Sequence, residues 1–392
     1  MILLSIVAAL VAAVLLLSTV SDIVSVCVAA FTRVEPTRGG SASRSRLMFV
    51  IPAHDEEQMV ADCVRSVLAL SYPKAHIGIV VIADNCSDRT AEKVRDCGVR
   101  CLERTDDARR GKPHAIAWAL DRVDFAAWDA VVILDADTVV HEAYAAELDR
   151  AAPLRGKAME CYNDVRNPDD TRLTRMATVF AAGLFRGAFA LKRRAGLNVP
   201  LSAGMCIGTD VLAAHPWKAF GLSEDWEAYA ILTSAGVTIG LASGAHLYAQ
   251  EARTLHQATS QRVRWLTGRL SALATQGPAL LRSRKIGWRQ KVDAIAELAA
   301  PGPAVQFALC VGIATVSWIG NAPAGRACTV ALCLSLVRPA AYAMVGLYHD
   351  RAPLRAASAF AYLPVYAVWR LVVAARGLMP FQGREWVRSA RG

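Results

Sequence analysis

Acidic residues follow three apolar segments of the chain, and this arrangement constrains the fold more than any other feature. The segments are LMFVIPAHDEE, IGIVVIAD and VVILDAD, and their acidic residues include Asp55, Asp84, Asp135 and Asp137. Each apolar run has the length and continuity of a strand buried on both faces of a parallel sheet. Ligands of open α/β sheets bind outside the carboxyl ends of the strands. The sequence therefore predicts an acidic pocket at one sheet edge, with a divalent metal and a phosphorylated ligand as the simplest occupants.

The region from 47 to 150 alternates between strand and helix patterns. Strands are predicted at 47–53, 77–83, 99–104 and 130–135, and helices at 56–70, 88–97 and 112–123. This alternation is typical of a doubly wound parallel sheet. Residues 157–272 combine shorter strands and helices and include a long basic and apolar stretch at 171–196. We therefore expect one α/β domain over 47–272.

The N-terminal segment is apolar enough to cross a membrane. From Met1 to Phe31 the sole charged residue is Asp22, and the apolar run from Ile2 to Val20 is long enough to span a bilayer. A cleaved signal peptide is the alternative, but no basic region precedes the run and no small-residue cleavage site ends it. We predict a transmembrane helix over 1–31. The basic linker 32–46 then places the next domain in the cytoplasm by the positive-inside rule.

Apolar segments return in the C-terminal part, where we expect a membrane region over 301–379 with two or three segments. Two spans are predicted at 303–320 and 327–347. The stretch 354–379 contains three arginines and Pro364, so it either crosses the membrane or lies in the interface. We favour the interface, because the basic tail 380–392 then stays cytoplasmic. A further interfacial amphipathic helix is expected within 273–300, mainly over 280–300, and no further domain after the tail.

Composition and charge indicate a membrane surface as the partner. The hydrophobic content is 54% and the mean hydropathy is +0.29, as expected for an integral protein of a bacterial plasma membrane. The net charge of +10 could suit nucleic acid, but many basic residues flank apolar segments, as in 282–291. We therefore expect contacts with anionic lipid head groups and no nucleic-acid partner. The ten cysteines show no CxxC or zinc spacing, which indicates reduced thiols in the cytoplasm.

The Asp-Ala-Asp sequence at Asp135 and Asp137 predicts a metal site. Mg²⁺ and Mn²⁺ prefer oxygen ligands, and Mg²⁺ is usually held by one or two carboxylates together with substrate phosphates. One carboxylate could bind the metal and the other a sugar or ribose hydroxyl. A solvated acidic turn is the alternative, but the position directly after an apolar strand favours Mg²⁺ or Mn²⁺.

Two further motifs follow, SEDWE at 223–227 and QRVRW at 261–265. SEDWE has the pattern of a helix start, with Ser223 as the N-cap and acidic residues in the first turn. In QRVRW, Gln261, Arg264 and Trp265 would share one helix face. An amphipathic helix with Arg262 and Arg269 on a solvated face is the structural alternative.

Taken in order, these motifs resemble those of a known enzyme family. VIPAHDEE, IADNCSDRTAEK, RGKPHAIAWAL, VVILDADT, LSEDWEA and QRVRW follow one another along the sequence. Together they resemble the membrane-bound family 2 glycosyltransferases, which include cellulose, chitin and hyaluronan synthases. The resemblance covers about residues 47–272 and extends to the flanking membrane segments. It implies a Rossmann-like GT-A fold and an inverting, metal-dependent transfer from a UDP-sugar.

The resemblance also implies roles for individual residues. The residues expected near the donor and its nucleotide are Ala53, His54, Glu56, Asp84, Lys112, Asp135, Gln261, Arg264 and Trp265. Asp137 would bind the metal, and Asp225 would be the general base that deprotonates the attacking hydroxyl. The residues expected on the acceptor side are Ser202, Gly204, Met205, Glu224 and Trp265.

Three functions remain open from the sequence. The first is a glycosyltransferase that extends a polysaccharide, whose export could involve accessory subunits. The second adds one sugar to a lipid acceptor, as ceramide glucosyltransferases do. The third is a non-catalytic membrane protein with a degenerate transferase domain, which the intact acidic motifs disfavour. We favour polysaccharide extension.

Overall fold

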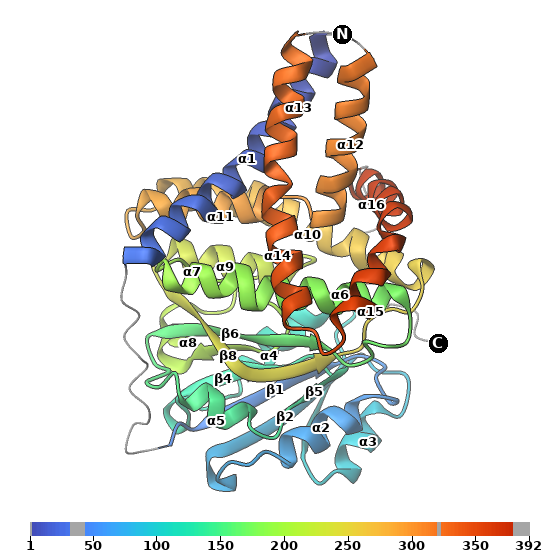
Figure 1. Cartoon of the computed structure of the whole chain (residues 1–392). Coiled ribbons are helices and arrows are strands. Elements are labelled where there is room, and N and C mark those ends of the chain that lie inside the picture. The colour runs from blue at the N-terminus through green and yellow to red at the C-terminus, as the bar shows by residue number, and fades with distance from the viewer. Residues whose placement is uncertain (1, 32–43, 320–322, 379–392) are drawn as a thin grey trace. The chain divides into compact units, whose positions relative to one another are not determined.

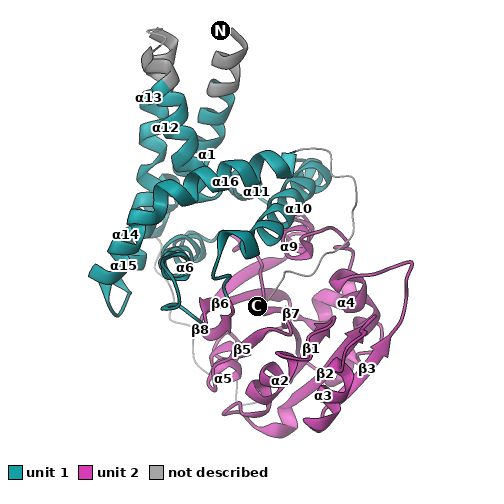
Figure 2. Cartoon of the chain, turned by 90° about the vertical axis from the view of Figure 1, so that its right-hand side faces the viewer, with its two compact units in different colours: residues 1–33, 167–197, 251–392 teal, residues 34–166, 198–250 magenta. Residues whose placement is uncertain are grey.

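The computed structural model describes residues 2–31, 44–319 and 323–378 (Figure 1). The chain forms two compact units, one of residues 1–33, 167–197 and 251–392 and one of residues 34–166 and 198–250 (Figure 2). The stretch 47–272, expected to form a single domain, therefore contributes to both units. Most of the linker 32–46 and the whole basic tail 380–392 lie outside the described residues.

The second unit is built on an eight-stranded sheet with the order β3-β2-β1-β4-β7-β6-β8-β5. Its strands are β1 Leu47–Ala53, β2 Ile77–Asp84, β3 Arg100–Arg104, β4 Ala130–Ile133, β5 Thr138–Val140, β6 Lys157–Val165, β7 Met205–Gly208 and β8 Thr238–Ala249. The first four strands are mutually parallel, and Val50 of β1 pairs with Val80 on one side and Ile133 on the other. The predicted doubly wound half of the fold is therefore confirmed.

The other half of the sheet mixes strand directions. β7 runs antiparallel to both β4 and β6, β8 is parallel to β6, and β5 is antiparallel to β8. The ladder between β6 and β8 shifts register between Cys161 and Tyr162. With nine and twelve residues, β6 and β8 are longer than the short strands predicted there.

Helices cover both faces of the parallel strands. The helices of this unit are α2 Val60–Leu68, α3 Thr90–Asp96, α4 Lys112–Leu120, α5 Tyr144–Asp149, α8 Thr209–Ala214 and α9 Glu224–Ser234. Phe49 and Ile51 of β1 pack in one core cluster with Val60 and Val64 of α2. α2 begins later than the predicted residue 56, because Asp55 has a positive φ of 52° and residues 54–59 form turns instead.

In the first unit, every regular element among the described residues is a helix. Its helices are α1 Ile2–Phe31, α6 Arg172–Ala182, α7 Ala190–Arg194, α10 Leu255–Arg282, α11 Trp288–Ala299, α12 Pro303–Ile319, α13 Pro323–Ser335, α14 Val337–Tyr348, α15 Pro353–Ala359 and α16 Leu363–Leu378. A π-helical stretch, Gly183–Phe189, joins α6 to α7. A Cβ atom on Gly183 would lie 2.3 Å from the Tyr342 carbonyl oxygen of α14. Glycine at position 183 therefore permits the close packing of the π-helical stretch against α14.

Three stretches among the described residues are long and apolar enough to cross a membrane, namely Ala9–Phe31, Thr329–Tyr348 and Pro353–Leu378. A fourth would be the pair formed by α11 and α12, which is bent by 78°. Residue 320 of the predicted span 303–320 lies outside the described residues, and the part from Pro303 to Thr315 is counted as a candidate span together with α11. The interfacial placement of 354–379 stays a prediction, since its length and composition also suit a span.

The single amphipathic helix predicted over 280–300 is wrong. α10 continues to Arg282, and a new helix starts at Trp288. The intervening SRKIG has poor helix formers at both ends, and Ser283 and Gly287 take extended backbone conformations that end one helix and begin the next.

Candidate active site

The predicted acidic residues do come together at one edge of the sheet. Because β1, β2 and β4 are parallel, their carboxyl ends share that edge. Ala53 and Asp84 are the last residues of β1 and β2, and Asp135 lies two residues beyond β4. The sequence-based expectation of an acidic sheet edge is therefore confirmed.

Lys112 is the cation that balances this edge. It is the first residue of α4, directly after Gly111, whose φ of 104° favours glycine. Its Nζ atom lies 2.5 Å from Asp135 Oδ1 and 2.5 Å from Glu224 Oε1. Burial alone would lower the pKa of Lys112, but the two carboxylates outweigh it and raise the pKa above its ordinary value. Lys112 therefore stays charged and joins α4, the end of β4 and α9.

Asp225 lies beside this cluster, in the first turn of α9. Its Oδ1 accepts a hydrogen bond from the Trp226 backbone N–H at 2.8 Å. Burial and the neighbouring charge of Glu224 raise the pKa of Asp225 to about 7, although Lys112 acts in the opposite direction. A carboxylate with this pKa can accept a proton near neutral pH. Ser223 precedes α9 as predicted, but its side chain makes no capping hydrogen bond.

The Asp-Ala-Asp turn leaves both of its carboxylates partly exposed. Leu134 and Ala136 are buried, whereas Asp135 and Asp137 are only half-buried. The turn is closed by Thr138, whose N–H and hydroxyl donate to the Asp135 carbonyl oxygen at 3.1 and 2.7 Å. Two partly exposed carboxylates on one turn form the all-oxygen donor set that suits a hard divalent cation.

At the end of β2, Asp84 is almost fully buried and forms an ion pair with Arg104. Arg104 also binds Asp106 at 3.0 Å. The Nδ1 atom of His54 lies 2.7 Å from the Asp84 carbonyl oxygen. The residues predicted near the nucleotide thus include one carboxylate that already has a buried cationic partner.

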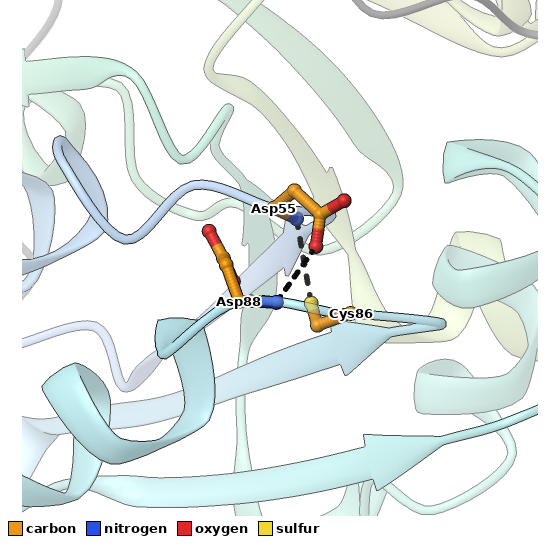
Figure 3. Close-up of side chains that lie close together, drawn as sticks. All are labelled: Asp55, Cys86 and Asp88. Atoms are coloured by element: carbon orange, nitrogen blue, oxygen red, sulfur yellow. Dashed lines mark hydrogen bonds between the residues drawn. The ribbon is translucent and has the colours of Figure 1, made fainter.

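A second acidic group lies where the segment after β1 meets the loop after β2 (Figure 3). The Glu56 N–H donates to Thr90 Oγ1 at 2.7 Å. Nearby, ligand atoms of Asp55, Cys86 and Asp88 lie within 4.8 Å of one another, close enough to hold a metal ion. This trio was not predicted as a site.

Hydrogen bonds already engage the carboxylates of that trio. Asp55 accepts the N–H groups of Ser87 at 2.7 Å and Asp88 at 3.3 Å. Burial alone would raise the pKa of Asp55, but these donors and His54 lower it. Asp88 accepts from Thr90 N–H at 2.9 Å and from Glu57 N–H at 3.0 Å. The trio therefore ties the ends of β1 and β2 together.

The predicted acceptor loop is held by a buried glutamate. Ser202 donates its N–H to Glu160 Oε2 at 2.8 Å and its hydroxyl to Glu160 Oε1. Gly204 has a φ of 78°, and its carbonyl oxygen accepts from the Tyr144 hydroxyl at 3.0 Å. Met205 is fully buried in β7. Ser202 is partly exposed and has a polar side chain, whereas Gly204 and Met205 are buried.

Comparison with known proteins identifies the family. A sequence profile described as "Glycosyltransferase like family 2" matches residues 45–268, more than half of the chain. The chain belongs to glycosyltransferase family 2. Its mixed α/β sheet is accordingly the GT-A fold that the sequence predicted.

Individual relatives of this glycosyltransferase are distant. The probable glycosyltransferase YdaM of Bacillus subtilis is 24% identical over 243 residues, covering 57% of this chain and 55% of that protein. The poly-beta-1,6-N-acetyl-D-glucosamine synthase of Staphylococcus epidermidis is 31% identical over 103 residues, covering 24% and 23%. The chain thus matches about half and about a quarter of the length of these relatives.

One solved structure resembles nearly the whole glycosyltransferase. It is the mannosyltransferase PcManGT of Pyrobaculum calidifontis, determined with GDP-Man and Mn²⁺. The TM-score is 0.59 at 16% sequence identity, and the alignment covers 96% of this chain and 99% of that one. At this identity the likeness shows a shared fold.

The QRVRW motif of the glycosyltransferase lies on α10, in the first unit. Gln261 and Arg264 are half-buried, and Trp265 is 37% exposed. The guanidinium of Arg262 stacks over the Trp265 ring at 4.4 Å and lies 2.5 Å from Glu251. The solvated face proposed for Arg262 in the structural alternative is therefore wrong.

Sequence reasoning missed two groups of residues near the site. Arg104 and Glu160 are buried partners of predicted site residues; Arg104 is the last residue of β3, and Glu160 lies within the buried part of β6. A charged residue at such a position was the signal that could have found them. His114 and Phe220 stack at 4.9 Å between centroids. This pair joins residues far apart in sequence, so no local pattern predicts it.

Proposed function

We propose that this chain is a membrane glycosyltransferase that transfers a sugar from a UDP-sugar to a growing polysaccharide, with inversion at the anomeric carbon. The observation that carries the proposal is the Lys112 cluster with Asp225 beside it. It combines a cation, a carboxylate pair and a proton acceptor at the ligand-binding edge of a family 2 fold. The relatives add support, since one is a polysaccharide synthase.

A divalent metal fits the residues present. Asp137 is the proposed ligand, with Asp135 next to it on the same half-buried turn. Both offer oxygen, the donor that Mg²⁺ and Mn²⁺ prefer. When bound, such an ion supplies Lewis-acid stabilisation of the charge on a departing nucleoside diphosphate. Mn²⁺ in the structure of PcManGT supports this choice.

The chain's own residues would supply orientation and proton transfer. Asp225 would accept the proton of the attacking acceptor hydroxyl, since its pKa of about 7 suits a general base. Lys112 would hold Asp135 and Glu224 in place and offer its charge to donor phosphates. Ala53, His54, Glu56 and Asp84 would line the nucleotide side.

The proposal also assigns roles to the QRVRW residues and to the residues expected on the acceptor side. Gln261, Arg264 and Trp265 would contact the donor, with Arg264 able to pair with phosphate oxygens. Trp265 would also offer a flat surface to an acceptor sugar. Ser202, Gly204, Met205 and Glu224 would lie on the acceptor side, where Ser202 has the clearest access.

We place the chain in a bacterial plasma membrane with the catalytic unit in the cytoplasm; the three candidate spans and the basic residues that follow the first of them support this placement. The same apolar helices favour a second candidate, single transfer to a lipid acceptor, because a lipid held at the bilayer surface could reach a membrane-bound enzyme. The motifs resemble those of the membrane-bound group that includes cellulose, chitin and hyaluronan synthases.

The test uses purified full-length protein in lipid with Mg²⁺ or Mn²⁺ and a panel of radiolabelled nucleotide sugars. The panel includes UDP-sugars and GDP-mannose, the donor type bound by PcManGT. Label in a long water-soluble chain supports polysaccharide synthesis, and label in an organic-extractable product one sugar larger supports lipid transfer. Label from GDP-mannose alone overturns the UDP-sugar assignment. No transfer from any donor overturns the enzymatic proposal, whereas transfer by Asp225→Asn at the wild-type rate overturns the assignment of Asp225 as the base.

A further inference from the structure

The connection between α10 and α11 exposes apolar and basic residues side by side in the sequence. Leu281 is 58% exposed and Trp288 is 68% exposed. Between them lie Arg282, Arg284 and Lys285, all exposed. No acidic residue occurs from 276 to 292. We refer to Leu281, Arg282, Arg284, Lys285 and Trp288 as the basic corner.

The structure separates the basic residues of this region into two groups. Arg289 donates to the Ala195 carbonyl oxygen at 3.2 Å, and Lys291 donates to the Leu281 carbonyl oxygen at 2.8 Å. Both therefore stabilise the first unit internally. Within the part of the chain that the structure describes, the side chains of Arg282, Arg284 and Lys285 have no hydrogen bond or ion pair, although the Lys285 backbone N–H donates to Ser283 Oγ at 3.1 Å.

Nearby acidic residues do not neutralise the corner. Asp293 and Glu297, on α11, are directed to the buried Lys192, which forms ion pairs with both. Their charge is thus balanced inside the helical unit. The corner keeps three positive charges next to a largely exposed tryptophan.

The residues of the basic corner are of the types that bind at the surface of an anionic bilayer. Basic side chains close to a span attract anionic head groups, and tryptophan is enriched at the level of those head groups. The corner ends at Trp288, the first residue of α11, and α11 and α12 are the bent pair that could form a further span. In water, by contrast, an indole this exposed gains nothing from burial.

We propose that the basic corner binds the head groups of anionic phospholipids, with Arg282, Arg284 and Lys285 on the phosphates and Trp288 at the head-group level. The proposal rests on the membrane placement given above. It adds a lipid preference that neither the fold nor the active site implies.

Trp288 provides the probe for the test. Full-length protein is placed in mixed micelles with an equal fraction of dibrominated phosphatidylglycerol or dibrominated phosphatidylcholine, since bromine quenches a tryptophan in contact with the lipid. The difference between wild type and Trp288→Phe isolates the signal of this residue. We expect several-fold stronger quenching by the phosphatidylglycerol, and loss of that preference at high salt.

The charge variants decide the assignment. Arg282→Gln, Arg284→Gln and Lys285→Gln together should remove the preference for phosphatidylglycerol. A matched control replaces three exposed arginines of the other unit, Arg65, Arg100 and Arg122, by glutamine and should keep it.

Two negative outcomes are distinguishable. Equal quenching by both lipids, or an unchanged preference in the triple variant, overturns the proposal while the membrane placement stands. No quenching of Trp288 by either lipid, with extraction of the protein by alkaline carbonate, overturns the placement as well. Neither readout requires a sugar donor, so the result is independent of the proposed transfer activity.

Discussion

Lys112 binds two carboxylates at once, and this explains how several acidic residues can share one sheet edge. Asp135 and Glu224 come from different elements, and each lies 2.5 Å from the ammonium group. Without that cation, their repulsion would be relieved by protonation or by movement of α9. Burial raises the pKa of Asp225 most strongly, Glu224 raises it further, and Lys112 lowers it.

The pKa of Asp225 predicts the pH dependence of the transfer. A general base works when deprotonated, so a pKa of about 7 means that kcat/KM rises with pH and levels off above that value. The rise should be about tenfold per unit well below the pKa. Measuring kcat/KM from pH 5 to 9 at fixed metal concentration tests this.

A variant of Asp225 tests whether the loss of activity at low pH comes from protonation of Asp225 or of another group. Asp225→Asn should lower kcat by about 10²- to 10⁴-fold and remove the acidic limb. The exposed Asp121, at the end of α4, is a matched control, and Asp121→Asn should keep the wild-type profile. An acidic limb that persists in Asp225→Asn would assign the titration to another group.

Glu160 predicts a pH dependence of stability. Burial raises its pKa well above the ordinary value, more than the Ser202 hydrogen bonds lower it. The folded state therefore holds the proton more tightly than the unfolded state, and stability is lost as pH rises above the unfolded pKa of about 4.3.

The comparison variant for Glu160 is Glu160→Gln, which cannot ionise. An amide can also keep both contacts with Ser202, by accepting from the N–H and donating to the hydroxyl. We expect the thermal midpoint of the wild type to fall relative to Glu160→Gln between pH 6 and 9. Parallel curves would show that the wild-type carboxyl is ionised in the folded state. Glu160→Ala should lower stability at every pH, because the Ser202 donors lose their partner.

Among the elements, the parallel strands were predicted well and the remaining strands poorly. β1, β2 and β4 are continuous apolar runs closed by polar residues, so their positions follow from sequence alone. β7 is short, and its direction depends on pairing with β4 and β6, far away in sequence. Likewise, the boundary at 283–287 depends on two backbone conformations that the basic pattern of 280–300 does not encode.

The same contrast holds for the candidate site. The acidic residues that end strands were predictable, because parallel strands bring their carboxyl ends together. Arg104 and Glu160 were not, because burial decides their role, and burial depends on how the sheet is covered. The stacking of His114 on Phe220 depends on the packing of the loop before α9 against α4.

The entry into β7 gives a prediction at this scale. Gly204 has a φ of 78°, and a Cβ atom there would lie 2.1 Å from Leu247 Cδ2, whose side chain is fully buried. Gly204→Ala should therefore be destabilised by both backbone strain and overlap. Gly98 is the matched control, since its φ is 75° and a Cβ would meet nothing within 4 Å.

The two variants separate strain from overlap. Gly98→Ala should cost about 1–2 kcal/mol, the penalty of the left-handed conformation. Gly204→Ala should cost more and should lower the thermal midpoint further. Equal shifts in a thermal melt of the full chain would mean that Leu247 moves aside without loss.

The two units interleave along the chain, and this could not be read from the motifs. The motif-bearing stretch leaves the sheet at 167–197 and again after 250 to join the helical unit. That exchange depends on close contacts between distant segments. A Cβ atom on Gly346 of α14, for example, would lie 2.1 Å from the Val179 carbonyl oxygen of α6. Sequence periodicity predicts each helix but not this pairing.

Buried charges hold the helical unit together across long sequence distances. Lys192 of α7 is fully buried and pairs with Asp293 of α11 and, at 3.3 Å, with Glu297. Ser21 of α1 donates to Asp293 Oδ1 at 2.9 Å. Arg338 of α14 binds Glu297 at 2.9 Å and Asp22 at 2.6 Å. One network therefore connects helices from the N-terminal, middle and C-terminal parts of the chain.

Removing Lys192 tests whether this network determines the stability of the whole chain. Lys192→Met leaves Asp293 buried without its cation, which should cost about 3–5 kcal/mol. Replacing both partners, as Lys192→Met with Asp293→Leu, removes the uncompensated charge and should restore most of the thermal stability, because Glu297 keeps Arg338. Lys93→Met, on α3 of the sheet-containing unit, controls for the loss of a lysine. Melting temperatures of full-length protein in one detergent give the comparison. If the double variant is as unstable as the single one, Lys192 and Asp293 stabilise the protein through packing or through the hydrogen bond from Ser21. Compensation of the buried charge would then not be the cause.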